Sequence, residues 1–147
     1  MNSVTKPKPA GLLRVFGCIF YDALLLFAVL FVSTLAFLVI PASVRDISVP
    51  VQVGKILWYL GISYLYFVWF WRHGGQTPGM KAWHVHLTNC EGYAPSESAM
   101  AKRFFAAILS WLLLGTGFLW MVLDREKRSL HDRLSGTCLV FGKKQKT

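Results

Sequence analysis

The sequence predicts an all-α membrane protein: two transmembrane helices, a glycine-broken helical segment, and a small β element at the cytoplasmic face. The first observation behind this is hydropathy, because 54% of the 147 residues are hydrophobic and they gather in long blocks. Second, Asp22 is the only side chain charged at neutral pH in residues 15–40, and residues 56–71 carry none. Third, blocks of about 17–25 apolar residues match the hydrocarbon thickness, and neither block has the polar stripe of a soluble helix.

The first block follows a polar tail, residues 1–10, which we expect to be flexible. Three basic residues precede it, as in a secretory signal peptide, but its apolar run is longer than the ~7–15 residues of a signal core. Asp22 also interrupts the run, and no small-residue cleavage site lies at the right distance. We therefore expect a retained span over about residues 12–40, which Pro41 ends because proline cannot continue a helix.

A second span is expected over about residues 54–71, and its aromatic end followed by Arg72 is typical of the membrane–water interface. Residues 74–79, GGQTPG, predict a sharp turn. Apolar and polar side chains then alternate over residues 83–88, the period of a half-buried strand, and residues 136–141 are a second β-like run. The two runs can pair into a small sheet at the membrane surface.

Residues 104–123 are a third uncharged block, long enough to cross a bilayer, but Gly115 and Gly117 interrupt its middle. Two alternatives stay open: a third crossing, or a re-entrant or interfacial helical hairpin. Of the 16 Lys and Arg residues, all but Arg45 and Lys55 lie in the N-terminal arm, the central loop or the C-terminal tail. The positive-inside rule places these three parts in the cytoplasm and favours the hairpin, which returns to the same face.

The net charge of +9 does not predict nucleic-acid binding, since the basic residues flank membrane segments and no nucleic-acid-binding motif accompanies them. Cys18, Cys90 and Cys138 are far apart and odd in number, so free thiols are expected. His84 and His86 share one strand face but have no third ligand at diagnostic spacing, so we expect no metal and no cofactor. Soluble-enzyme motifs do not occur, and we expect no enzymatic activity.

Three stretches of the sequence carry a family resemblance. LLRVFGCIFYD contains Arg14 and Asp22, GGQTPGMKAWHVHL follows the second span, and GFLWMVLDREKRSLHDRLSGT contains Asp132. In order, spacing and hydropathy they resemble the RDD family of small bacterial membrane proteins, named for one arginine and two aspartates. Asp132 looks like the family's second aspartate, and Arg103 also fits the pattern.

The resemblance implies a membrane domain over residues 11–141, followed by a flexible basic tail, residues 142–147. It also implies a multi-pass protein of the bacterial cytoplasmic membrane. Family members are associated with transport, and some similar proteins are credited with cation/proton exchange. The family has ordinary strand residues where His84 and His86 stand, so the resemblance implies no metal role for them.

Asp22 is the first candidate functional residue, because a carboxylate within a span costs about 2.5–3.5 kcal/mol unless it has a partner, a proton or a wet cavity. One interpretation is a proton- or cation-binding carboxylate. The other is a structural ion pair or hydrogen bond with Arg14, Arg103 or Tyr21.

His131 and Asp132 are the second candidate site, with two interpretations of the same kind. They can form an acid–base site, or Asp132 can cap backbone amides or bind Arg103.

Two functions therefore stay open. The first is transport of an ion or small solute by a homo-oligomer, since two spans and a hairpin do not readily enclose a path. The second is a non-catalytic scaffold or accessory subunit that binds a membrane-protein partner or anionic lipid of the bilayer through its basic segments.

Overall fold

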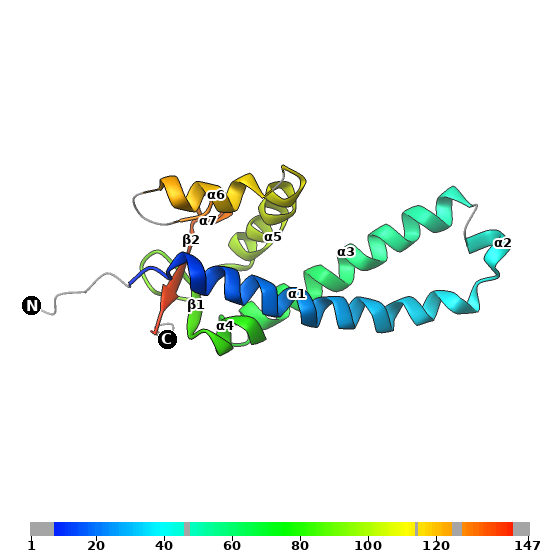
Figure 1. Ribbon diagram of the computed structural model, residues 1–147, viewed down its shortest axis with the longest axis horizontal. Coiled ribbons are helices and arrows are strands. Elements are labelled where there is room, and N and C mark those ends of the chain that lie inside the picture. The colour runs from blue at the N-terminus through cyan, green and yellow to red at the C-terminus, as the bar shows by residue number, and fades with distance from the viewer. Residues whose placement is uncertain (1–7, 46–47, 114, 125–127, 143–147) are drawn as a thin grey trace, which may run out of the picture.

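The computed structural model describes residues 8–45, 48–113, 115–124 and 128–142. Two long helices form an extended arm, and the short helix Ala42–Arg45 lies at the tip where they connect (Figure 1). The helices and strands that follow the second long helix gather at the opposite end of the arm. The described elements are, in chain order, α1 (Leu12–Thr34), η1 (Leu35–Val39), α2 (Ala42–Arg45), α3 (Val49–Arg72), α4 (Pro78–Ala82), β1 (Val85–Asn89), α5 (Glu97–Leu112), α6 (Thr116–Leu123), α7 (Leu130–Ser135) and β2 (Thr137–Phe141).

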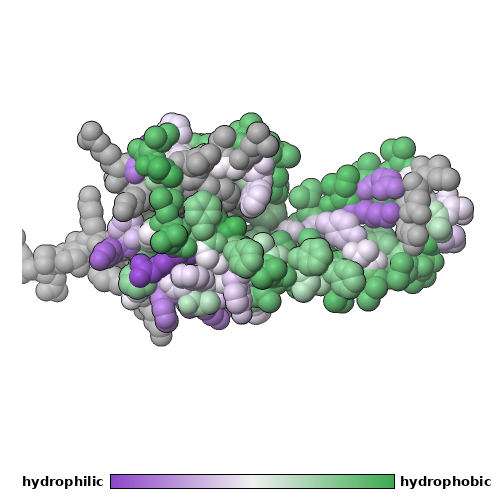
Figure 2. All heavy atoms as spheres, in the orientation of Figure 1, coloured by the Kyte–Doolittle hydropathy of each residue, from purple (hydrophilic) through white to green (hydrophobic). Residues whose placement is uncertain are grey.

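The two predicted spans are present as helices. Helix α1 with η1 covers 28 residues and contains an 18-residue stretch of mean hydropathy 2.5. Helix α3 covers 24 residues and contains such a stretch at 1.3, and these are the described helices long and apolar enough to cross a membrane. Helix α3 begins earlier than predicted, at Val49, because Pro50 lies in the first turn, where its missing N–H is tolerated. Figure 2 shows apolar side chains along the outer surface of the arm, as expected for helices that face lipid.

The third apolar segment is broken at the predicted place. Helix α5 has 16 residues and α6 has 8, so neither reaches the roughly 20 residues that a crossing requires. Gly115 lies between them with φ of 74°, a left-handed conformation that glycine adopts without a steric penalty. Gly117 lies so close to α5 that a Cβ there would be 2.0 Å from Ser110 Oγ. The glycines therefore fold this segment into a tight helical hairpin.

The predicted sheet is also confirmed. Strands β1 and β2 are antiparallel, and Val85 pairs with Phe141 while Asn89 pairs with Thr137. The chain ahead of α1 joins them, since the Ala10 N–H donates to the Leu139 carbonyl at 2.9 Å. The segments before α1, after α3 and after α7 thus meet at one end of the arm, above a core of buried apolar side chains.

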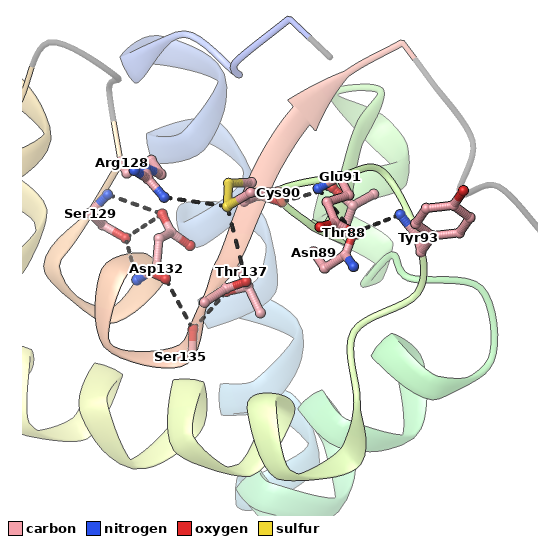
Figure 3. The surroundings of a disulfide bond; sticks show 12 residues. Thr88, Asn89, Cys90, Glu91, Tyr93, Arg128, Ser129, Asp132, Ser135 and Thr137 are labelled. Atoms are coloured by element: carbon pink, nitrogen blue, oxygen red, sulfur yellow. Dashed lines mark hydrogen bonds between the residues drawn. A yellow bond between two sulfur atoms is a disulfide. The ribbon is translucent and has the colours of Figure 1, made fainter. Parts of the chain in front are cut away.

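The expectation of free thiols is wrong for two of the three cysteines. Cys90 directly follows β1, and its disulfide partner Cys138 lies in β2, with their Cα atoms 5.2 Å apart (Figure 3). Pairing of the strands brings them together, because Cys138 lies opposite Thr88. Distance along the chain, 48 residues, conceals this proximity. Cys18 is free and buried in α1.

Candidate functional site

Asp22 is buried within α1 and accepts hydrogen bonds from three neutral donors. The Thr77 hydroxyl donates to Oδ2, the Gly79 N–H donates to Oδ1 at 2.8 Å, and the Tyr66 hydroxyl donates to Oδ1 at 3.3 Å. Thr77 is held in place because its hydroxyl also caps α4, where it accepts from the Met80 N–H at 3.2 Å. Through these hydrogen bonds Asp22, in the middle of α1, connects this helix to the start of α4 and to Tyr66 of α3.

The predicted partners of Asp22 are wrong. Arg103 pairs with Asp132 instead, and the exposed Arg14 guanidinium lies 3.9 Å from the centre of the Phe141 ring. Tyr21 is exposed on α1. The turn GGQTPG supplies the partners because it folds back onto α1, which hydropathy alone does not reveal.

Gly79 permits this close approach. A Cβ at that position would lie 2.5 Å from the Cys18 carbonyl oxygen and 2.8 Å from Asp22 Cγ. We expect Gly79→Ala to lower the free energy of unfolding by about 1–3 kcal/mol, because α1 and α4 would have to separate. Thermal unfolding of the purified protein measures it. Gly61→Ala is the control, since nothing lies within 4 Å of a Cβ there, and equal effects of the two substitutions would contradict the expectation.

Arg103 and Asp132 form a buried ion pair between α5 and α7, with side chains 5% and 1% exposed. Arg103 Nη1 also donates to Thr137 Oγ1 at 2.9 Å. The second carboxylate oxygen of Asp132 accepts from the Ser129 N–H at 3.0 Å and from the Ser129 hydroxyl (Figure 3). Asp132 thus does both things left open by the sequence: it binds Arg103 and caps the start of α7.

These contacts set the charge state of Asp132. Burial raises its pKa, but Arg103, His131 and the Ser129 hydroxyl outweigh that effect and hold the pKa below its ordinary value. The carboxylate is therefore ionised at neutral pH, and its charge is compensated by Arg103.

A cavity of about 350 Å³ lies mainly between α1, α3 and α5, and residues of α4, α7 and the two strands complete its wall. Of the five predicted site residues it brings together three, Asp22, Arg103 and His131, while Arg14 and Asp132 are not in its wall. The rest of the lining is mainly apolar and aromatic. The cavity places a carboxylate in the middle of the domain next to a space of ligand size.

The model of the RDD family matches residues 9–136, which is most of the chain. The chain belongs to the RDD family. Neither the curated proteins nor the solved structures contain a match to it. Membership of the RDD family and the two apolar helices together support a membrane protein.

Sequence reasoning missed several residues of this RDD site. Thr77, Gly79 and Tyr66 hold Asp22, and aromatic side chains from α3 and α5 line the cavity. A usable signal was present for Thr77, because threonine followed by proline is typical of a helix N-cap and its first residue. Tyr66 and the lining aromatics had no such signal, since aromatic residues are ordinary packing groups of a span.

His131 of this RDD protein is buried beside Arg103. Burial, and then the Arg103 charge, lower the pKa of His131 to about 4 from an ordinary 6.5, and Asp132 opposes this only in part. The imidazole is therefore neutral at pH 7, which does not suit it to acid–base chemistry near neutrality.

We expect the stability of the protein to fall as the pH is lowered. The unfolded chain takes up a proton at His131 near pH 6.5 and the folded chain only near pH 4, so protons favour unfolding in this window. The contribution of neutral His131 to the free energy of unfolding is complete above pH 6.5, and it decreases by about 2–3 kcal/mol as the pH falls toward 4. Thermal unfolding against pH measures it, and His131→Gln should flatten this part of the curve. An unchanged curve in that variant would contradict the assignment.

Proposed function

We propose that this protein is a non-enzymatic transport subunit of the bacterial cytoplasmic membrane, which acts as a homo-oligomer and exchanges a cation for protons. The proposal rests on Asp22, a buried carboxylate in the wall of the cavity. Its partners are neutral, and among the described residues no basic side chain pairs with it.

The surroundings of Asp22 suit a site for a mobile positive charge. Two donors use Oδ1, and Thr77 is the donor to Oδ2, so the carboxylate keeps acceptor capacity for a further ligand. Neutral donors fix the position of the carboxylate without cancelling its charge. Arg103, the other charged group of the lining, is already compensated by Asp132. A proton or a cation entering the cavity is therefore attracted to Asp22.

The proposed orientation follows from the fold and the basic residues. The segments before α1, after α3 and after α7 meet at the sheet end of the arm. In the sequence, the N-terminal arm, the central loop and the C-terminal tail carry all the Lys and Arg residues except Arg45 and Lys55. We place this end in the cytoplasm, with the α5–α6 hairpin returning to the same face. The apolar outer surfaces of α1 and α3 then contact lipid or a second copy of the chain.

Flux measurements in sealed vesicles test the proposal. Vesicles with the reconstituted protein and an acidic interior are given external cations, and we expect proton release in wild type and its loss in Asp22→Asn. Glu97→Gln is the matched control, because Glu97 is exposed and pairs with Arg72 away from the cavity. Gel filtration confirms that each variant is folded. Equal flux in wild type and folded Asp22→Asn would rule the proposal out.

A scaffold is the second candidate, because the carboxylates of both aspartates are engaged in internal contacts. Asp22 joins α1 to α3 and α4, and Asp132 joins α7 to α5. In a scaffold these residues hold the helices together while the basic segments of the chain bind a partner protein or anionic lipid. A wild type without flux, together with an Asp22→Asn variant of lower stability, would favour this function.

A further inference from the structure

We infer that the cavity binds an organic cation with an apolar body, in preference to Na⁺ or K⁺. This inference rests on the proposed transport function and names its substrate class. Three properties of the lining carry it: its charge, its shortage of oxygen ligands, and its aromatic side chains.

The charge of the lining favours a cation. Asp22 contributes a carboxylate whose hydrogen-bond donors among the described residues, Tyr66, Thr77 and Gly79, are all neutral. Arg103 is neutralised by its ion pair with Asp132. His131, which lies beside Arg103 in the cavity wall, carries no charge at neutral pH because its pKa is lowered. Cys18, next to Asp22 on α1, lies in the wall as a free thiol.

The lining lacks the oxygen atoms that an inorganic cation requires. Hard cations exchange their hydration shell for about six or more oxygen ligands, as in calcium sites or in rings of carbonyl groups. Besides Asp22, the side-chain oxygen atoms of the lining are the hydroxyl groups of Ser63 and Thr77 among the described residues. The Ser63 hydroxyl donates to the Tyr59 carbonyl at 2.7 Å, and the Thr77 hydroxyl donates to Asp22. Dehydration of Na⁺ or K⁺ would therefore not be compensated here.

The aromatic side chains of the lining suit a weakly hydrated organic cation. Phe67 and Trp71 of α3 and Phe104 and Trp111 of α5 face the cavity that also contains Asp22. The centre of the Phe67 ring lies 5.5 Å from that of Trp71 and 6.3 Å from that of Phe104, so these three rings are contiguous. The Arg103 guanidinium already lies over the Trp71 ring, at 5.5 Å from its centre, which leaves the phenylalanine faces for a ligand. Aromatic faces attract ammonium groups, and quaternary ammonium ligands are bound in this way.

The volume sets the size of the ligand. A space of about 350 Å³ holds about twelve non-hydrogen atoms, at the ~30 Å³ that a group the size of water occupies in a liquid. Benzyltrimethylammonium has about this size, and neopentylbenzene is its uncharged counterpart of the same shape. The pair therefore separates the effect of charge from that of shape.

Binding of radiolabelled benzyltrimethylammonium to the full chain in lipid nanodiscs tests the inference. We expect saturable binding that unlabelled benzyltrimethylammonium displaces, whereas an excess of NaCl or KCl, or neopentylbenzene at equal bilayer concentration, does not. Displacement by Na⁺ or K⁺ would overturn the inference in favour of an inorganic cation site. Displacement by neopentylbenzene would overturn it in favour of an apolar cavity without charge selectivity.

Two variants locate the binding site. Asp22→Asn is expected to weaken binding by about tenfold or more, the effect of losing a contact with a charged group. Since Asp22 also holds α4, Ala107→Phe provides a second variant that fills the cavity and leaves the carboxylate in place. Its control is Ala28→Phe, at an exposed position of α1 outside the lining. Binding that survives Ala107→Phe would place the ligand elsewhere and overturn the inference.

Separate measurements of binding and of flux distinguish failure of the proposed transport function from failure of the proposed substrate class. Proton-coupled flux of Na⁺ or K⁺ without binding of benzyltrimethylammonium would refute the substrate class and support transport. Specific binding of benzyltrimethylammonium without flux of any cation would refute transport and support the ligand site.

Discussion

Replacing Arg103 by methionine is expected to lower the free energy of unfolding by about 3–5 kcal/mol. The substitution keeps most of the apolar stem of the side chain but leaves the Asp132 carboxylate, which is 1% exposed, without its cation. An uncompensated buried charge costs far more than the contact itself contributes. Thermal or denaturant unfolding in detergent measures the change.

Two further variants distinguish the cost of leaving the Asp132 carboxylate unpaired from the cost of losing an ordinary ion pair. Arg72→Met removes the exposed pair with Glu97, whose side chains are 65% and 70% exposed, and should cost less than about 1 kcal/mol. Arg103→Met combined with Asp132→Leu removes both buried charges and should recover much of the stability. If Arg103→Met costs no more than Arg72→Met, the buried pair does not stabilise the domain as described.

Reduction of the Cys90–Cys138 disulfide is expected to lower the free energy of unfolding by about 4 kcal/mol. The bridge closes a 48-residue loop that contains α5, α6 and α7, and the reduced unfolded chain gains the corresponding conformational freedom. Unfolding with and without a reductant measures it. The Cys90→Ser/Cys138→Ser variant should resemble the reduced protein and not respond to reductant. A response in that variant, or none in wild type, would contradict the expectation.

The proposed orientation makes this disulfide conditional on the cell compartment. The sheet end of the arm is placed in the cytoplasm, where thiols are kept reduced. Cys90 is exposed, so the bridge is accessible to thiol reagents. We therefore expect both thiols to be reduced in growing cells and to form the bridge on oxidation after isolation.

The two long helices, the break between α5 and α6 and the two strands could be predicted from the sequence because they depend on local patterns, whereas the short helices α2, α4 and α7 were not predicted. Uncharged blocks identified α1 and α3, paired glycines located the break between α5 and α6, and alternation identified the strands. Hydropathy and periodicity act over one or two helical turns or a few strand residues, so a single chain displays them directly.

The candidate site could not be predicted in the same way, although its main residues were named. Asp22 was recognised from its cost within a span, but its partner Thr77 lies 55 residues away. The alternative of a bond between Arg103 and Asp132 was recognised without a way to decide it, and the structure contains it. The cavity was not foreseen, because its wall combines several helices and both strands, whose packing no local pattern encodes.

The sequence by itself therefore determined two apolar helices and a third apolar segment broken by glycines in a chain of the RDD family, and it left open whether that segment crosses the membrane. Tertiary structure alone decided that neutral donors hold Asp22, that Arg103 compensates Asp132, and that two distant cysteines meet across the sheet. The physical reason is the distance along the chain over which each effect acts. Burial in lipid and helix breaking act on each segment separately, whereas a buried charge is satisfied by whichever group the packing of the whole chain brings next to it.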